Sequence, residues 1–212
     1  MKDIITTLQK LHYRIENKIV GRLDEFKKNN TKQKIEKEFF FCLLTPQCRA
    51  KVCWDNIEAL SSSGLLYSGS EQDISNNFRG IRFRNNKAHY IVEAREKFFN
   101  GSGSFLRLIS EEKDSFFLRQ YIVKNIKGMG YKEASHFLRN IGKGDELSIL
   151  DRHILRGLKK TSVIEEIPES LSEKKYLEIE KAMKKFAIEK VKVPVAHLDF
   201  LFWYLFNGEI FK

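Results

Sequence analysis

The chain has 212 residues, of which 38 are Lys or Arg and 28 are Asp or Glu, so its formal net charge is +10. Hydrophobic residues make up 42% of the sequence and Pro and Gly are few, a composition that can bury a core and that excludes disordered or collagen-like protein. The positive excess predicts a polyanionic partner, which leaves nucleic acid, an anionic membrane surface and a phosphate-rich ligand open.

Hydrophobic periodicity predicts helices along nearly the whole chain. Residues 36–44 are apolar nearly all round, which is typical of a central buried helix, and Pro46 should stop it. The stretch 61–70 holds five Ser and two Gly and is expected to be a loop or a break. No strand and no repeat is expected, so the fold class is all-α. In chain order, the predicted helices cover about 4–15, 36–44, 49–60, 86–99, 111–126, 131–141, 151–158, 173–191 and 194–206.

Targeting and cysteine signals favour a reducing cytoplasm. Charged residues interrupt the N-terminal segment throughout, unlike a signal peptide, and no apolar run is long enough to cross a bilayer. Cys42, Cys48 and Cys53 are an odd number and lack a nearby histidine that would complete a zinc site. We therefore expect three small buried side chains on helices rather than disulfides or metal ligands.

The sharpest local feature is the segment Lys-Gly-Met-Gly-Tyr-Lys between two predicted helices, residues 127–132. Gly128 and Gly130 would let the backbone adopt positive φ and approach another group closely. Backbone N–H groups at the following helix N-terminus would then form an anion site that suits a phosphodiester, with Met129 inserted into the core. An ordinary turn between helices remains the alternative, whereas a Walker or dinucleotide loop would need a preceding strand.

Lys132 and Asp151 are the candidate reactive residues. Lys132 lies in the first turn of a helix, where the helix dipole and neighbouring Lys127 would disfavour an ammonium and favour a nucleophilic amine. Asp151 is a natural N-cap whose carboxylate should stay ionised, and it can stabilise a developing sugar cation and handle protons. The alternatives are a solvated Lys and a purely structural cap, although one carboxylate can serve both roles.

Residues 127–140, followed by Leu-Asp-Arg-His at 150–153, resemble the helix-hairpin-helix DNA glycosylase superfamily, and more closely its type 2 8-oxoguanine DNA glycosylase/AP lyases. The similarity covers most of the chain. Its further segments are 41–45, 87–92, 166–168, 175–180 and 198–205.

The resemblance implies a two-domain all-α fold with the active site in the interdomain cleft. Residues 32–150 would form the central domain with the hairpin, and residues 1–31 plus 151–212 the second domain. Lys132 would attack the sugar C1′ as the damaged base leaves, and the resulting Schiff base would allow β-elimination. Asp151 would be the essential carboxylate.

The same resemblance assigns residues to DNA binding. Gly128 and Gly130 would hold a backbone phosphate, and His153 matches a phosphate-contacting position, although a plain surface histidine is an equal alternative. Gln47 occupies the turn where relatives place Asn or Gln in the gap left by the flipped base. The sequence departs there from the more usual Thr-Ala-Asn, so the residue that fills the gap stays open.

Four residues would recognise the extruded purine. Phe83 and Trp203 match the family's stacking pair, with core packing as the alternative for both. The C-terminal Lys212, including its carboxylate, would lie beside the base, where a carboxylate can accept a hydrogen bond from the N7–H that 8-oxoguanine has and guanine lacks. Asp199 would also line the pocket, unless it only supports the start of its helix.

No iron–sulfur cluster is expected, because no Cys follows Asp151, and no side-chain metal site is expected. A monovalent cation at hairpin carbonyls near Ile126 and Met129 is common in the superfamily. The expected partner is double-stranded DNA containing 8-oxoguanine, bound by a monomer in the cytoplasm near the nucleoid, with no membrane. A glycosylase for another base and a non-catalytic DNA-binding module remain alternatives; the pairing of Lys132 with Asp151 disfavours the second.

Overall fold

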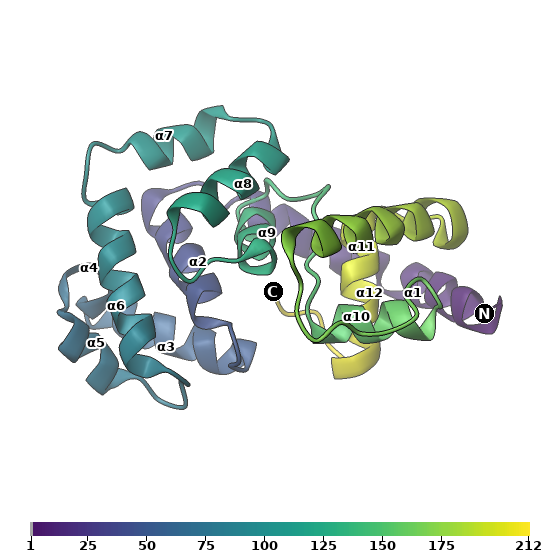
Figure 1. The fold of residues 1–212 in the computed structure, drawn as a ribbon, viewed down its shortest axis with the longest axis horizontal. Helices are drawn as coiled ribbons and strands as arrows, with labels where there is room; N and C mark the ends of the chain where they lie inside the picture. Colours follow the sequence, from purple (N-terminus) through teal and green to yellow (C-terminus); the bar gives the residue numbers. More distant parts are fainter. Residues whose placement is uncertain (1) are drawn as a thin grey trace.

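The computed structural model describes residues 2–212, and every regular element in that part is a helix, as the sequence predicts (Figure 1). The first half contains α1 (Lys2–Lys27), α2 (Lys32–Leu44), α3 (Ala50–Ser62), α4 (Leu65–Ser68), α5 (Glu71–Asn77), α6 (Arg84–Ala94), η1 (Arg95–Phe99) and α7 (Ser104–Glu111). The second half contains α8 (Ser115–Asn125), α9 (Tyr131–Asn140), α10 (Arg152–Lys160), α11 (Glu173–Phe186), η2 (Ala187–Val191) and α12 (Val195–Asn207). None of these helices is long and apolar enough to span a bilayer.

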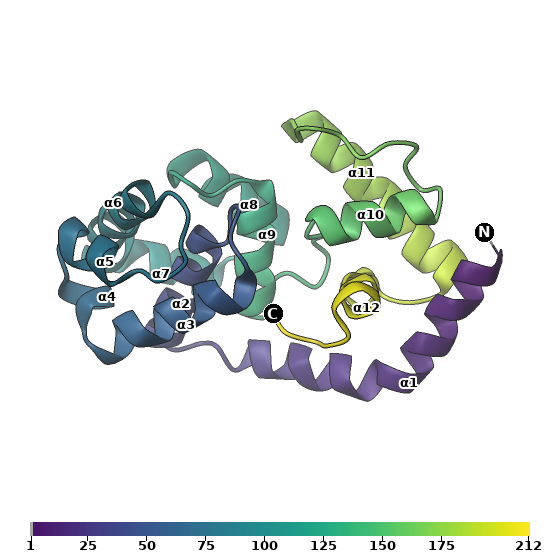
Figure 2. The same cartoon turned by 90° about the horizontal axis from the view of Figure 1, so that it is seen from below.

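Buried apolar side chains form two clusters. The first gathers side chains from residues 35–147, and the second gathers side chains from α1, α10, α11 and α12. In Figure 2, α1 runs alongside α12 and continues toward the first cluster, so the two ends of the chain share one core. The domain boundaries implied by the family resemblance stay a prediction.

The central position of α2 follows from its composition. Thr31 caps it by accepting a hydrogen bond from the backbone N–H of Lys34, and the helix ends at Leu44, just before Pro46. Phe39, Phe40 and Phe41 are fully buried, and Phe39 makes edge-on contacts with aromatic rings of η1, α7 and α9. A helix that is apolar all round therefore lies in the middle of the first cluster.

Three short helices escaped the sequence analysis. The expected loop at 61–70 contains α4, whose Leu66 is fully buried, and it ends at Ser70, which forms a capping box with Asp73 to start α5. The third is α7, which ends at Glu111, so the helix expected from residue 111 begins only at Ser115, where Asp114 caps α8. Helices this short give too few periodic positions to detect, so their caps are the better signal.

Cysteine placement was predicted only in part. Cys42 and Cys53 are buried on helices, and all three thiols are free. Cys48 is half-buried in the loop after α2, where its sulfur accepts a hydrogen bond from the ammonium of Lys87 at 3.2 Å. This thiol therefore helps to position a loop at the edge of the first cluster.

Two buried ion pairs join the clusters. Arg119 on α8 donates two hydrogen bonds to the carboxylate of Glu180 on α11, at 2.7 and 2.9 Å. Arg139 on α9 pairs with Asp199 on α12 at 3.2 Å. Buried, hydrogen-bonded pairs fix geometry because loss of either partner leaves a buried polar group without its hydrogen bond, so they hold the two halves in register.

Candidate active site

A cavity of about 1210 Å³ opens between the two clusters. Its walls come from the loop after α2, from α9, from the start of α10, from α12 and from the C-terminal tail. Seven of the ten residues selected from the sequence line it: Gln47, Lys132, Asp151, His153, Asp199, Trp203 and Lys212.

The hairpin between α8 and α9 needs glycine at one position for its backbone. Gly128 has φ +82°, and a Cβ there would come within 2.7 Å of the Tyr90 ring. Gly130 has φ −88°, so the expectation of positive φ at both glycines is wrong, although an added Cβ would lie 3.1 Å from the Glu133 carboxylate. Met129 is buried in the first cluster, as predicted.

The hairpin also presents free donors. Within residues 2–212, the backbone N–H groups of Gly128, Gly130 and Lys132 donate to no protein acceptor. They lie at the N-terminal end of α9, where the helix dipole favours negative charge. This arrangement suits a phosphate group.

Lys132 lines the cavity from the first turn of α9. Its ammonium donates a hydrogen bond to the hydroxyl of Thr45, at the end of α2, over 3.0 Å, and lies 3.7 Å from Glu133. Lys127 instead pairs with Glu93 on α6 at 3.2 Å. The expectation that Lys127 acts electrostatically on Lys132 is therefore unsupported, because the charge of Lys127 is met elsewhere.

Asp151 caps α10, as predicted. One carboxylate oxygen accepts hydrogen bonds from the backbone N–H groups of His153 and Ile154, both at 2.8 Å. The other has no protein hydrogen-bond donor among the described residues. Asp151 and Lys132 make no ion pair with each other but line the same cavity, which leaves room for a substrate between them.

His153 and Trp203 form one aromatic wall of the cavity. Their rings meet edge to face with centroids 5.0 Å apart, and Phe206 packs beside His153. The Nδ1 of His153 and the indole Nε1 of Trp203 are buried, and neither has a hydrogen-bond partner within residues 2–212. Buried polar atoms without partners are costly, so this wall is suited to a ligand that supplies the missing bonds.

Asp199 also lines the cavity, although it is only 2% exposed. It pairs with Arg139, whose guanidinium also stacks on Phe200 at 4.7 Å. Burial raises the pKa of the Asp199 carboxyl to about 8, with Arg139 opposing the shift. Asp199 is well inside α12, whose N-cap is Pro194, so the helix-start alternative is wrong. Its carboxylate instead ties α12 to α9.

The C-terminal tail crosses between the clusters, and Figures 1 and 2 both place the chain end beside α9. Ile210 packs against the second cluster, and Phe211 against the first. The ammonium of Lys212 contacts the carboxylate of Glu38 and lies 3.3 Å above the Trp54 ring. Burial lowers the pKa of Lys212, with Glu38 opposing the shift. The last residue is thus fixed in the cavity wall.

Sequence comparison supports one family. The profile of the family described as 8-oxoguanine DNA glycosylase matches residues 19–192. The chain belongs to this family. It is 42% identical over 217 residues to the 8-oxoguanine DNA glycosylase/AP lyase of Fusobacterium nucleatum subsp. nucleatum, covering 99% of this chain and 98% of the relative. The enzyme of the same name from Methanocaldococcus jannaschii is 38% identical over 93% of both chains.

Solved structures agree with this family assignment. The Methanocaldococcus jannaschii 8-oxoguanine glycosylase/lyase in complex with a 15mer DNA containing 8-oxoguanine superimposes with a TM-score of 0.88, at 34% identity and 99% coverage of both chains. The 8-oxoguanine DNA glycosylase of Thermotoga maritima gives a TM-score of 0.88 at 30% identity, covering all of both chains. The all-α helix-hairpin-helix glycosylase fold expected from the sequence is therefore confirmed.

Phe83 is the selected side chain that the structure separates from the others. It is 56% exposed at the N-cap of α6, with φ +56°, and the Arg82 guanidinium lies 5.8 Å from its ring. It does not line the cavity, so the predicted pair with Trp203 is not assembled here. Its role in base recognition stays a prediction.

Sequence reasoning missed the residues that position the site. Lys87 is buried, and its ammonium donates to the carbonyls of Leu44 and Pro46 at 2.7 and 2.8 Å. It thereby fixes the loop that presents Gln47. The Gln47 side chain is exposed, and its backbone has φ +56°. His136 lines the cavity with both ring nitrogens unpartnered, and burial lowers its pKa, which favours a neutral ring. Lys87 lies in a segment that resembles the family, but only the folded chain shows its partners.

Proposed function

We propose that this protein removes 8-oxoguanine from double-stranded DNA and then cleaves the strand at the resulting abasic site, as a bifunctional glycosylase and AP lyase. One observation carries the proposal: Lys132 and Asp151 line one cavity directly beside a hairpin of free N–H groups, in a chain that belongs to the 8-oxoguanine DNA glycosylase family. A binding module would need the hairpin but neither reactive side chain.

Lys132 supplies the nucleophile. Its neutral amine forms a bond to the sugar C1′ while the glycosidic bond breaks and its electron pair leaves with the base. Opening of the sugar ring gives a Schiff base, and loss of a proton from C2′ then expels the 3′ phosphate. Thr45 accepts a hydrogen bond from Nζ at 3.0 Å and so orients the amine toward the cavity.

Asp151 stabilises the positive charge that develops on the sugar. The helix cap holds one carboxylate oxygen in place, while the other keeps its lone pairs free for the substrate. A fixed carboxylate aimed at developing charge needs little reorganisation during the reaction, which is the main source of electrostatic catalysis. It also accepts and returns protons as the Schiff base forms and breaks.

DNA is held by backbone and side-chain groups around the cavity rim. The hairpin N–H groups at Gly128 and Gly130 bind a phosphate, His153 contacts another, and Gln47 enters the gap left by the flipped nucleotide. Basic residues on the rim add a salt-dependent attraction to the backbone. They are Arg49, Lys51, Arg82, Arg152 and Arg156.

The base enters between the two clusters. Trp203 stacks on it, and the Lys212 carboxylate accepts the N7–H that distinguishes 8-oxoguanine from guanine. Asp199 supports this pocket through Arg139. Phe83 would complete the stack only after the segment before α6 moves, because it lies outside the cavity in the free protein.

The remaining expectations concern cofactors and context. The hairpin carbonyls fit a monovalent cation: Ile126 accepts only a 3.3 Å hydrogen bond from Met129, and the Met129 carbonyl accepts none within residues 2–212. Such an ion would steady the hairpin for phosphate binding. The protein would act as a monomer in the cytoplasm, without an iron–sulfur cluster.

Borohydride trapping tests the proposal. The native protein should form a covalent adduct with a duplex that carries one 8-oxoguanine, because borohydride reduces the Schiff base. Lys132→Gln should form none, whereas Lys124→Gln, which alters an exposed lysine on α8, should trap normally. No adduct with the native protein, or an undiminished adduct with Lys132→Gln, would contradict the mechanism and favour a binding module.

A further inference from the structure

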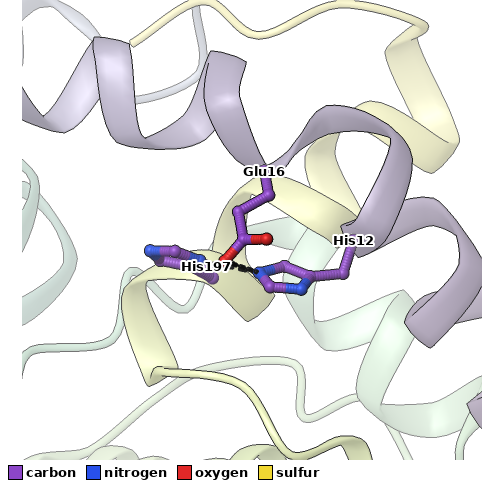
Figure 3. A group of neighbouring side chains, drawn as sticks. All are labelled: His12, Glu16 and His197. Atoms are coloured by element: carbon purple, nitrogen blue, oxygen red, sulfur yellow. Dashed lines mark hydrogen bonds and ion pairs between the residues drawn. The ribbon is translucent and has the colours of Figure 1, made fainter.

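A cluster of two histidines and a glutamate lies outside the catalytic cavity. His12 and Glu16 are one helical turn apart on α1, and His197 is in the first turn of α12 (Figure 3). None of the three lines the cavity between the clusters. The proposed glycosylase chemistry therefore gives this cluster no role.

The three side chains point toward one another (Figure 3). His12 Nε2 and His197 Nδ1 are 2.8 Å apart and share a hydrogen bond, and a Glu16 carboxylate oxygen lies 3.9 Å from the same His12 nitrogen. The ligand atoms of all three residues lie within 4.8 Å of one another. Three donors from two helices therefore converge on one small volume.

The distances need only a small adjustment to fit a metal ion. Zn²⁺ with ligand bonds near 2.0–2.1 Å and tetrahedral angles places its ligand atoms roughly 3.3 Å apart. The histidine nitrogens would separate slightly, and the Glu16 carboxylate would move slightly closer, which it can do because its side chain is half exposed. A water molecule would supply the fourth ligand.

Charge and burial also favour a cation. His197 is 9% exposed and the His12 side chain 16%, so water gives these two nitrogens little competition for a metal. In the structure the two imidazole nitrogens share one proton in their hydrogen bond. A metal replaces that proton with a bond to each nitrogen, and Glu16 contributes the compensating negative charge.

We propose that His12, Glu16 and His197 form a structural site for one divalent transition-metal ion, with Zn²⁺ as the best fit to two imidazoles and one carboxylate. The sequence analysis expected no side-chain metal site and did not consider these residues, since His12 and Glu16 are far from His197 in the chain. The ion would clamp the N-terminal helix to α12. Since α12 also carries Asp199 and Trp203, the clamp would steady one wall of the cavity without taking part in the chemistry.

Metal titration of tag-free, chelator-treated protein tests this site. Calorimetry should find one Zn²⁺ per chain, and a hundredfold excess over Kd should raise Tm by roughly 5–10 °C. Co²⁺ should give a visible spectrum of nitrogen and oxygen ligands, without the thiolate charge-transfer band that binding at Cys48 would produce.

Variants separate this site from chance binding. His12→Ala and His197→Ala should each weaken Zn²⁺ binding by more than about 100-fold, since even changes around a metal's direct ligands cost 10–100-fold. The matched control is His89→Ala, because His89 lies between Glu71 and Glu93 without a second histidine. That control should bind Zn²⁺ as tightly as the native protein.

The proposal fails if Zn²⁺ does not bind saturably, if binding survives in both histidine variants, or if Co²⁺ reports thiolate ligands. Should His197→Ala fail to fold, Glu16→Gln provides the same test, because Glu16 is exposed and its change should leave the fold intact while weakening binding at least about tenfold. Excision of 8-oxoguanine by metal-free His12→Ala should equal that of the metal-free native protein.

Discussion

The two walls of the catalytic cavity satisfy their polar groups differently. On the wall built by the first cluster, Lys132 donates to Thr45, and Lys87, which does not itself line the cavity, donates to two carbonyls and a sulfur of the adjoining loop. On the opposite wall, Trp203 Nε1 and His153 Nδ1 are buried without partners. His136 is the exception on the first wall, since neither of its ring nitrogens has a partner.

This difference separates positioning from recognition. A reactive amine must be held in one place before the substrate arrives, so it needs a partner in the free protein. A recognition surface must instead keep hydrogen-bonding atoms free for its ligand. Each buried polar atom without a partner costs about 1–3 kcal/mol until the ligand supplies the hydrogen bond. Lys132 on the first wall is therefore held in place before a substrate arrives, whereas the second wall keeps buried polar atoms of His153 and Trp203 available for a ligand.

The largest expected effect is a loss of catalytic rate in a variant that still folds. Asp151→Asn should reduce single-turnover excision of 8-oxoguanine by about 10²–10⁴-fold, because the carboxylate no longer stabilises developing charge or carries protons. Asn is also a good N-cap, so α10 should keep its start and the Tm should change little. The matched control is Asp114→Asn, since Asp114 caps α8 in the same way but outside the cavity. Equal losses of excision in both variants would show that Asp151 acts only as a cap.

A second variant pair tests how the cavity reads the base. Deleting Lys212 should reduce excision of 8-oxoguanine by about 10–100-fold, the loss expected for one hydrogen bond to a charged group. Cleavage of a preformed abasic site should persist, because no base is present to be read. Lys212→Met removes the ammonium that contacts Glu38 but keeps a terminal carboxylate. If both variants lose excision equally, the carboxylate does not read the base.

The third prediction tests how much the hydrogen bonds of Lys87 contribute to stability. Lys87→Met leaves the Leu44 and Pro46 carbonyls without their donor and should lower the free energy of unfolding by about 1–3 kcal/mol, measured from the urea midpoint. It should also weaken DNA binding, because the Gln47 loop loses its anchor. Lys143 donates in the same way to the carbonyls of Ser110 and Glu112, away from the cavity. Lys143→Met should therefore lose stability but not DNA affinity, and equal effects on affinity would contradict the assignment.

The sequence predicted the parts of the site that depend on local chemistry. The Asp151 cap, the positive φ of Gly128 and the burial of Met129 each follow from a few neighbouring residues. Periodicity likewise placed most of the long helices, although the first, expected over about 4–15, extends to Lys27. The last turns of the helices that end near residues 99 and 191 are π-helical. These features need no knowledge of the rest of the fold.

Features that depend on distant contacts were not predictable in this way. The partners of Lys87 and of Asp199, and the approach of His12 to His197, join residues far apart in the chain. No spacing rule encodes such pairs, because each exists only after the helices pack. Phe83 shows the converse: a resemblance selects it, but its place in this structure depends on the conformation of the loop before α6.

The last prediction concerns the pH dependence of stability, which involves the buried carboxyl that links the two walls. Because burial raises the pKa of Asp199 to about 8, this group binds its proton in the folded chain at pH values where the unfolded chain has already released it. Its contribution to the free energy of unfolding is therefore fully present below the unfolded pKa, near 4, and is lost as the pH rises toward 8. One such proton gives a slope of at most about −1.4 kcal/mol per pH unit. Urea unfolding of the native protein between pH 5 and pH 8 should show this decline, and Asp199→Asn should flatten it. An unchanged slope in that variant would mean that Asp199 is ionised throughout and that Arg139 holds its charge.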